Sequence, residues 1–255
     1  MRERRVRVDH QVLGGRIVVI TRPAGTASAL VRRVRKLGGA PLLLPGLSLR
    51  AVADPAAARA ALLQALNDEL LIFTSPAAVN YAAALSPLRT AATTLAVGQG
   101  TARALRRHGV PAPLVPAQQN SEGLLDLPPL QVLLGRRVAL IGAPGGRGVL
   151  RKQLVARGAQ LRELHVYRRM APRLDQRHVE ALRRLPDSAL MLLSSAEALH
   201  NLCELLPAAA LVRLRVATVV VSSERLALAA RNAGFERITL AESAVADDLL
   251  MAATR

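Results

Sequence analysis

Hydroxyl residues stand where an apolar stretch of this chain gives way to a helix. The clearest case is L-L-I-F-T-S-P at residues 70–76, in which Ser75 precedes a proline. A serine at this position can cap the helix through its side-chain oxygen, and the amides of the same turn can bind an anion. A serine hydrolase is disfavoured because the sequence has no G-x-S-x-G motif. Ser75 is therefore interpreted as a helix cap that also anchors an anion, and not as a nucleophile.

The same arrangement recurs along the chain. An apolar stretch, a turn of small or hydroxyl residues and a helix-like segment follow one another from Arg16, Leu70, Thr94, Arg137, Ala189 and Arg215. Uninterrupted apolar strands that alternate with helices are typical of parallel sheets covered on both faces. Ligands of such sheets bind at the carboxyl ends of the strands, so the turns should line a binding edge.

The six segments form two sets of three. The matches are T-S at 74–75 with S-S at 194–195 (offset of 120), V-G-Q-G-T-A-R-A-L from 97 with V-V-S-S-E-R-L-A-L from 220 (offset of 123), and G-G-A at 38–40 with R-G-A at 157–159 (offset of 119). Because the offsets nearly agree, the matches indicate an internal duplication. Two long extended stretches, 40–50 and 159–169, could each leave one sheet and bridge to another domain.

Composition limits the partners. There are 35 Lys plus Arg against 18 Asp plus Glu, and all but two of the cations are arginine. This charge fits a multiply anionic ligand, an anionic membrane face or nucleic acid, and codon bias would explain it equally well. Aromatic residues are too scarce for the stacking platforms of a single-strand binder, and no apolar run approaches the roughly 20 residues of a membrane span. We expect no nucleic-acid or membrane partner.

Metal and cofactor motifs are missing from the sequence. The five histidines are scattered, and His200 with Cys203 would supply only two ligands. The glycine-rich stretches at 98–103 and 142–148 have neither dinucleotide nor P-loop spacing. We expect no metal or cofactor. The single cysteine fits a reducing compartment, and the expected location is the cytoplasm.

A cleft lined by amides, hydroxyls and arginines suits a substrate with many carboxylates. Catalysis in such a cleft would depend mainly on holding a reactive substrate in one geometry. A non-catalytic two-domain binding or sensor module for a polyanionic small molecule would use the same turns, and this alternative remains open at the level of sequence.

Six motifs occur in one order along residues 16–250. They are T-R-P at 21–23, F-T-S-P at 73–76, V-G-x-x-T-A-x-A-L from 97, G-G-R at 145–147, V-Y-R-R at 166–169 and V-V-S-S-E-R-L-A from 220. Together they resemble the uroporphyrinogen-III synthase family. The resemblance implies an α/β protein with two similar domains, each a parallel sheet flanked by helices, joined by two extended crossover strands. The implied boundaries are 1–46 plus 171–255 for domain one, 51–166 for domain two, and linkers at 47–50 and 167–170.

The resemblance also implies a reaction. A monomeric enzyme would cyclise hydroxymethylbilane, a linear tetrapyrrole, with loss of water and inversion of its last ring through a spiro intermediate, and without a cofactor. By position, Tyr167 would assist departure of the hydroxyl group, although a linker tyrosine with a structural hydrogen bond explains it equally well. The implied substrate-binding residues are Thr21, Arg22, Ser75, Gly98, Thr101, Arg147, Ser194, Ser195 and Ser222.

The chain departs from the family pattern at three turns. Ala77 and Ala78 stand where many members carry a basic residue, Ser222-Ser223-Glu224 replaces G-P-T-T, and G-R-G replaces an arginine followed by an acid. These departures put individual contacts in doubt and leave the class unchanged.

Overall fold

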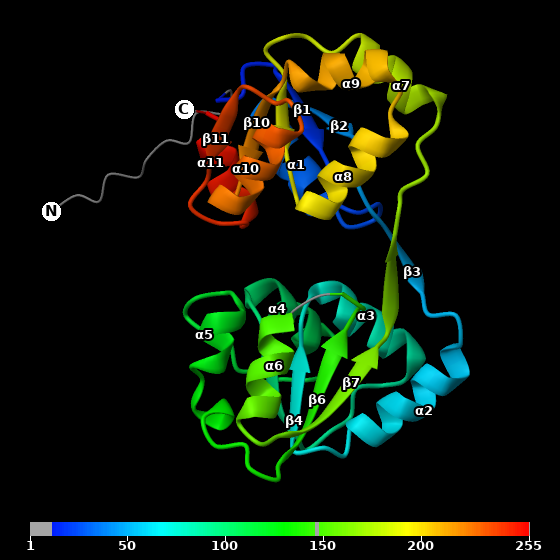
Figure 1. Ribbon diagram of the computed structural model, residues 1–255, viewed down its shortest axis with the longest axis vertical. Helices are drawn as coiled ribbons and strands as arrows, with labels where there is room; N and C mark the ends of the chain where they lie inside the picture. The colour runs from blue at the N-terminus through cyan, green and yellow to red at the C-terminus, as the bar shows by residue number, and fades with distance from the viewer. Residues whose placement is uncertain (1–11, 146–147, 255) are drawn as a thin grey trace, which may run out of the picture. The chain divides into compact units, whose positions relative to one another are not determined.

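The computed structural model describes residues 12–145 and 148–254. The chain divides into two compact units, of which unit 1 combines Met1–Ser48 with Met170–Arg255 and unit 2 is Leu49–Arg169 (Figure 1). The early and late parts of the chain therefore fold together, and the middle of the chain forms a unit of its own. Among the helices in the described ranges, none has the length and apolarity needed to cross a membrane.

Unit 2 is built on a four-stranded parallel sheet in the order β5-β4-β6-β7. The strands are β4 (Leu70–Phe73), β5 (Thr93–Ala96), β6 (Arg137–Gly142) and β7 (Gln160–His165). The central strands β4 and β6 are buried almost throughout, as their uninterrupted apolar sequences predict. Since all four strands run in one direction, their carboxyl ends meet at one edge of the sheet.

Helices cover both faces of this sheet. One face packs against α2 (Pro55–Ala65), α3 (Pro76–Leu85) and α4 (Gln99–Arg107), and the other against α5 (Ser121–Leu125), the short 3-10 helix η1 (Pro128–Leu130) and α6 (Gly148–Ala156). Strand β4 contributes side chains to the hydrophobic clusters on both faces. Leu71 and Phe73 pack in the cluster under α3, whereas Leu70 and Ile72 pack in the cluster under α6. This alternation is the period of two that a strand imposes.

Unit 1 has a five-stranded parallel sheet in the order β11-β10-β9-β1-β2. The strands are β1 (Ile17–Ile20), β2 (Ala40–Leu43), β9 (Leu190–Leu192), β10 (Thr218–Val221) and β11 (Ile238–Leu240). One face is covered by α7 (Gln176–Arg183), α8 (Ala196–Leu205), α9 (Ala208–Arg215) and α10 (Glu224–Asn232), and the other by α1 (Ser28–Lys36) and α11 (Ala246–Ala252). The predicted fold class, parallel sheets flanked by helices in two domains, is confirmed.

The sequence duplication is distributed over both units. Strands β1 and β6 begin 120 positions apart, and so do β2 and β7, and β4 and β9. The sheet orders β10-β9-β1-β2 and β5-β4-β6-β7 then correspond strand by strand, so each unit takes one half of each repeat. One predicted match is displaced by two positions, because the equivalent helix caps are Gly98 and Ser223, at an offset of 125 rather than 123.

Two further strands carry the chain between the units. They are β3 (Ser48–Ala51) and β8 (Tyr167–Met170), which form a two-stranded sheet. Each extended stretch predicted from the sequence is therefore two strands in succession, first β2 or β7 within a sheet and then β3 or β8. Tyr167 lies at the start of β8, yet it is only 7 % exposed and belongs to the core of unit 2.

The backbone of unit 1 makes a close contact after β2. A Cβ atom added to Gly46 would lie 2.4 Å from the Cβ of Ala198 and 2.8 Å from its Cα and carbonyl oxygen. We expect Gly46→Ala to lower the free energy of unfolding by about 1–3 kcal/mol, because overpacking displaces backbone. Urea unfolding followed by circular dichroism measures this. Gly148→Ala is the matched control, since a Cβ there meets nothing within 4 Å, and equal losses in the two variants would contradict the clash.

Candidate functional site

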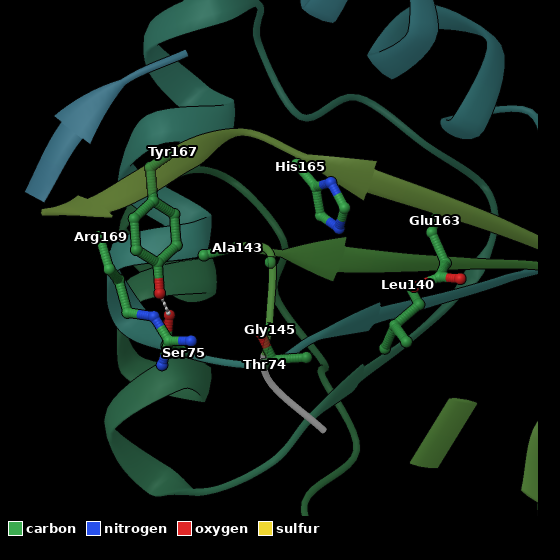
Figure 2. Close-up of a pocket in the computed structure, with 10 residues that line it drawn as sticks. Thr74, Ser75, Leu140, Ala143, Gly145, Glu163, His165, Tyr167 and Arg169 are labelled. Carbon is green, nitrogen blue, oxygen red and sulfur yellow. Dashed lines mark hydrogen bonds between the residues drawn. The ribbon is translucent and has the colours of Figure 1, made fainter. Parts of the chain in front are cut away.

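The carboxyl edge of the unit 2 sheet holds a cleft of about 210 Å³, here called the Tyr167 cleft. Its walls come from the turn after β4, the end of β6 with the turn that follows, and strands β7 and β8 (Figure 2). The lining residues are Thr74, Ser75, Leu140, Gly142, Ala143, Gly145, Glu163, His165, Tyr167 and Arg169. Parallel α/β sheets bind their ligands at this edge, which makes the cleft the candidate site.

Ser75 has two partners at the start of α3. Its backbone is extended, and its Oγ accepts a hydrogen bond from the amide of Ala78 at 3.0 Å, with Pro76 in the first helical turn. The predicted helix cap is confirmed. The same Oγ lies 3.2 Å from the Oη of Tyr167, so one hydroxyl both caps a helix and contacts the tyrosine. Figure 2 shows this contact as a dashed line.

Tyr167 is fixed by its ring as well as by its hydroxyl. The ring stacks on that of Tyr81 from α3, with centroids 5.3 Å apart and planes at 17°. With 7 % of the residue exposed, the phenol has little freedom to turn away. Helix α3 thus supplies both the stacking surface for the ring and the partner for the hydroxyl.

Thr74 and Gly142 form a close contact at the base of the cleft. The Oγ1 of Thr74 donates to the carbonyl of Ile141 at 3.2 Å. A Cβ at Gly142 would lie 2.5 Å from that Oγ1, so a larger residue would displace the threonine. Glycine at the end of β6 therefore keeps the Thr74 hydroxyl next to the strand.

Only Ser75 and Tyr167 of the ten lining residues were among the predicted site residues, and three of those missed have titratable side chains. They are Glu163, His165 and Arg169. In the stretch E-L-H-V-Y-R-R at 163–169, every second residue lines the cleft, because alternate side chains of an extended strand lie on one side. Glu163 is paired with Arg151 of α6, and Arg169 donates from Nη2 to the carbonyl of Pro144 at 2.9 Å. The alternation in the sequence was the signal that could have identified them. Arg147, a predicted anion contact, lies outside the described residues.

Gly98 and Thr101 do not line the Tyr167 cleft. Gly98 caps α4 with its backbone alone, and the Oε1 of Gln119 accepts the hydrogen bond of the Gln99 amide at 2.8 Å. Thr101 is only 2 % exposed. The amide of Gln99 at the start of α4 is therefore bound by Gln119 of the same unit. The hydroxyl of Thr101, which was predicted to contact a ligand, is buried.

The predicted residues of unit 1 lie at the carboxyl edge of its own sheet. The Oγ1 of Thr21 donates to the carbonyl of Leu192 at 2.9 Å and accepts from the amide of Ser194 at 3.0 Å. Thr21 is fully buried, so its hydroxyl joins the ends of β1 and β9 and is not offered to solvent. Ser195 caps α8 through the amide of Ala198 at 3.1 Å, as Ser75 caps α3.

Arg22 and Ser222 complete this edge. Arg22 is half-buried, and its Nη2 lies 3.4 Å from the carbonyl oxygen of Ala244. Burial lowers the pKa of its guanidinium from the ordinary value, but arginine remains charged at neutral pH. Ser222 is half-buried and directly precedes Ser223, which caps α10. The described residues of this edge thus include the cation of Arg22 and several hydrogen-bond donors.

The described residues contain no group of three or more His, Cys, Asp and Glu side chains that could hold a metal ion. Cys203 is half-buried on α8, and burial raises the pKa of its thiol. A raised pKa keeps the thiol protonated and unreactive. The chemistry available at either sheet edge is therefore that of hydroxyls, amides, arginines, the carboxylate and imidazole of β7, and the phenol of Tyr167.

Comparisons with known proteins agree with one another. The family model described as uroporphyrinogen-III synthase HemD matches residues 28–251. The uroporphyrinogen-III synthase of Escherichia coli (strain K12) is 32% identical over 256 residues, which cover 92% of this chain and 98% of that protein.

Two solved structures share the fold. Uroporphyrinogen-III synthetase from Helicobacter pylori 26695 matches with a TM-score of 0.61 at 16% identity, over 92% of this chain and 97% of that one. A mutant uroporphyrinogen III synthase from the extremely thermophilic bacterium Thermus thermophilus matches with a TM-score of 0.57 at 23% identity, over 92% and 96% of the two chains.

The contact between Thr74 and Gly142 can be tested by a double-mutant cycle. We expect Gly142→Ala to lower the free energy of unfolding by about 1–2 kcal/mol, because the new Cβ breaks the bond from Thr74 to Ile141. In a Thr74→Ala background the clash is gone, and the second substitution should cost much less. Chemical denaturation of the four proteins measures the coupling, and strictly additive losses would contradict the contact.

Proposed function

The chain belongs to the uroporphyrinogen-III synthase family, and we propose that it converts hydroxymethylbilane into uroporphyrinogen III with loss of water. The observation that carries this proposal is the Tyr167 cleft, where a buried phenol meets a hydroxyl at the carboxyl edge of a parallel sheet. A phenol can donate a proton, and the departure of a hydroxyl group requires one. Family membership favours this enzyme over a binding or sensor module for a polyanion that uses the same edges.

The substrate is a polyanion, and each sheet edge, taken by itself, offers donors that suit a carboxylate. In unit 2 the guanidinium of Arg169, which lines the Tyr167 cleft, supplies such donors. In unit 1 the half-buried Arg22 supplies the charge, and the exposed Ser194 and half-buried Ser222 supply hydroxyls. Hydrogen bonds between charged and polar groups are stronger than neutral ones, so several such contacts would fix the conformation of a flexible chain of four rings.

Tyr167 acts at the first chemical step of the proposed reaction. Its phenol proton passes to the oxygen of the terminal hydroxymethyl group, the C–O bond breaks, and the bonding electrons leave with water. The methylene carbon that remains is a cation stabilised by the lone pair of its pyrrole nitrogen, and the tyrosine is a phenolate. General acid catalysis of this kind contributes about 10²–10⁴ in rate.

Ring closure consumes the cation and restores the tyrosine. The carbon of the last ring that already bears the chain attacks the cation and gives a spiro centre. The older bond then breaks and re-forms at the free α-carbon, which inverts the ring, and the proton on that carbon leaves to the phenolate. Water is the only net loss. The protein contributes chiefly by holding the last ring over the cation.

We propose that the enzyme acts as a monomer, because one chain carries both sheet edges. We place it in the cytoplasm, since its single cysteine fits a reducing compartment.

The isomer formed tests the activity. Purified protein is supplied with freshly made hydroxymethylbilane, and the oxidised products are separated by chromatography. We expect the type III isomer to dominate with the protein present and the type I isomer to dominate without it. Formation of the type I isomer alone in both samples would refute the proposed function.

The role of Tyr167 is tested by Tyr167→Phe. We expect kcat to fall by about 10²–10⁴ because the acid is lost, while the melting temperature changes little, since the phenylalanine ring can still stack on Tyr81. Steady-state kinetics and thermal unfolding of the same preparation measure both quantities. An unchanged kcat would remove Tyr167 from the mechanism.

A further inference from the structure

We propose that Ser75 is a positioning residue for Tyr167. The hydroxyl of Ser75 donates a hydrogen bond to the phenol oxygen of Tyr167, and the phenol proton is thereby left facing the cleft. The inference rests on the proposed acid role of Tyr167. It assigns to Ser75 a task other than the anchoring of a substrate carboxylate.

The hydrogen-bond inventory of Ser75 supports this direction. Its Oγ already accepts from the amide of Ala78 at 3.0 Å, which leaves its single hydrogen for another partner. That partner is the Oη of Tyr167 at 3.2 Å. Were the tyrosine the donor, its proton would be held by Ser75 and withheld from the substrate.

The phenolate formed in the first step permits only one direction. A deprotonated phenol has no hydrogen to give, so the hydroxyl of Ser75 must be the donor while Tyr167 is charged. A hydrogen bond to a charged oxygen is about twice as strong as a neutral one. Ser75 therefore stabilises the state that follows proton transfer more than the state that precedes it, which lowers the barrier.

The surroundings of the pair suit this role. Ser75 caps the N-terminus of the ten-residue helix α3, and the partial positive charge at a helix N-terminus favours a nearby anion. The ring of Tyr167 is held on Tyr81 of the same helix. One rigid element thus fixes the ring, supplies the donor and favours the charge on the phenolate.

Kinetics separate positioning from substrate anchoring. We expect Ser75→Ala to lower kcat by about 10- to 100-fold, the value of one hydrogen bond to a charged group, with KM changed by less than about threefold. An anchor for a substrate carboxylate predicts the opposite, a raised KM with kcat retained. That result would overturn the inference while leaving the proposed function in place.

Two further substitutions separate donation from helix capping. Ser75→Thr keeps both the hydroxyl and the cap and should retain kcat within a few-fold. Ser75→Asp keeps a strong cap but has no hydrogen to donate, so the melting temperature should hold while kcat falls as in Ser75→Ala. Asp54→Ala is the matched control, because Asp54 caps α2 through the amide of Ala57 at 2.9 Å and does not line the Tyr167 cleft. Retained kcat in Ser75→Asp would overturn the inference.

A spectroscopic measurement tests the hydrogen bond without substrate. The chain has two tyrosines and no tryptophan, so Tyr167 is the sole tyrosine in a Tyr81→Phe background. The intensity ratio of the tyrosine Raman doublet reports whether the phenol oxygen accepts a hydrogen bond. We expect an accepting phenol that becomes non-accepting when Ser75→Ala is added and stays accepting when Asp54→Ala is added. An unchanged ratio with Ser75→Ala would overturn the inference, whereas failure of the proposed function would appear separately, as formation of the type I isomer alone by the unmodified protein.

Discussion

The common direction of the strands within each sheet determines where this chain can bind a ligand. Helices cover both faces of each sheet, so only the edges remain accessible. At the carboxyl edge most strands are followed by a turn and the start of a helix, where backbone amides have no partner within the helix. Strands β2 and β7 differ, because they lead into β3 and β8. Serine hydroxyls at these turns cap the helices by accepting from one amide each, and they keep a hydrogen of their own to donate. An anionic ligand is therefore favoured at this edge by topology before any single contact is considered.

The Tyr167 cleft needs one element that leaves the sheet. Strand β7 ends at His165 and the chain continues almost directly into β8, so residues 163 to 169 pass the carboxyl edge in extended form. Alternate side chains of this segment then line the Tyr167 cleft. Strand β7 brings the imidazole of His165 to the cleft, and the connecting strand β8 brings the phenol of Tyr167 and the guanidinium of Arg169.

Local patterns in the sequence correctly predicted the six apolar strands and the serine caps, whereas they did not predict β11 or contacts between distant segments. The apolar runs that became β4, β6 and β9 are buried because only a covered sheet accommodates them, and Ser75 caps α3 because capping requires only neighbouring residues. The contact between the hydroxyls of Ser75 and Tyr167 joins positions 92 apart, and neither F-T-S-P nor V-Y-R-R predicts it. The turn at Gly98 was predicted to bind an anion from its own residues. Its contact with Gln119 could not be predicted, because Gln119 reaches the start of α4 from a loop whose path depends on the fold. Thr101 carries a hydroxyl, but its burial is decided by the packing of α4 on α3.

The duplication shows what unit 1 carries in place of the phenol. Residue 47 is the equivalent of Tyr167 at an offset of 120, and it is a buried leucine. The equivalent of Tyr81 is Asn201 of α8, which donates to the carbonyl of Gly46 at 2.9 Å. In both units, then, the helix after the central strand holds the chain as it leaves the sheet, through an aromatic stack in unit 2 and through a side-chain hydrogen bond in unit 1. Both contacts therefore hold the chain where it leaves a sheet. In unit 2 the residue held in this way is a tyrosine, so the same contact also places a phenol hydroxyl at the cleft.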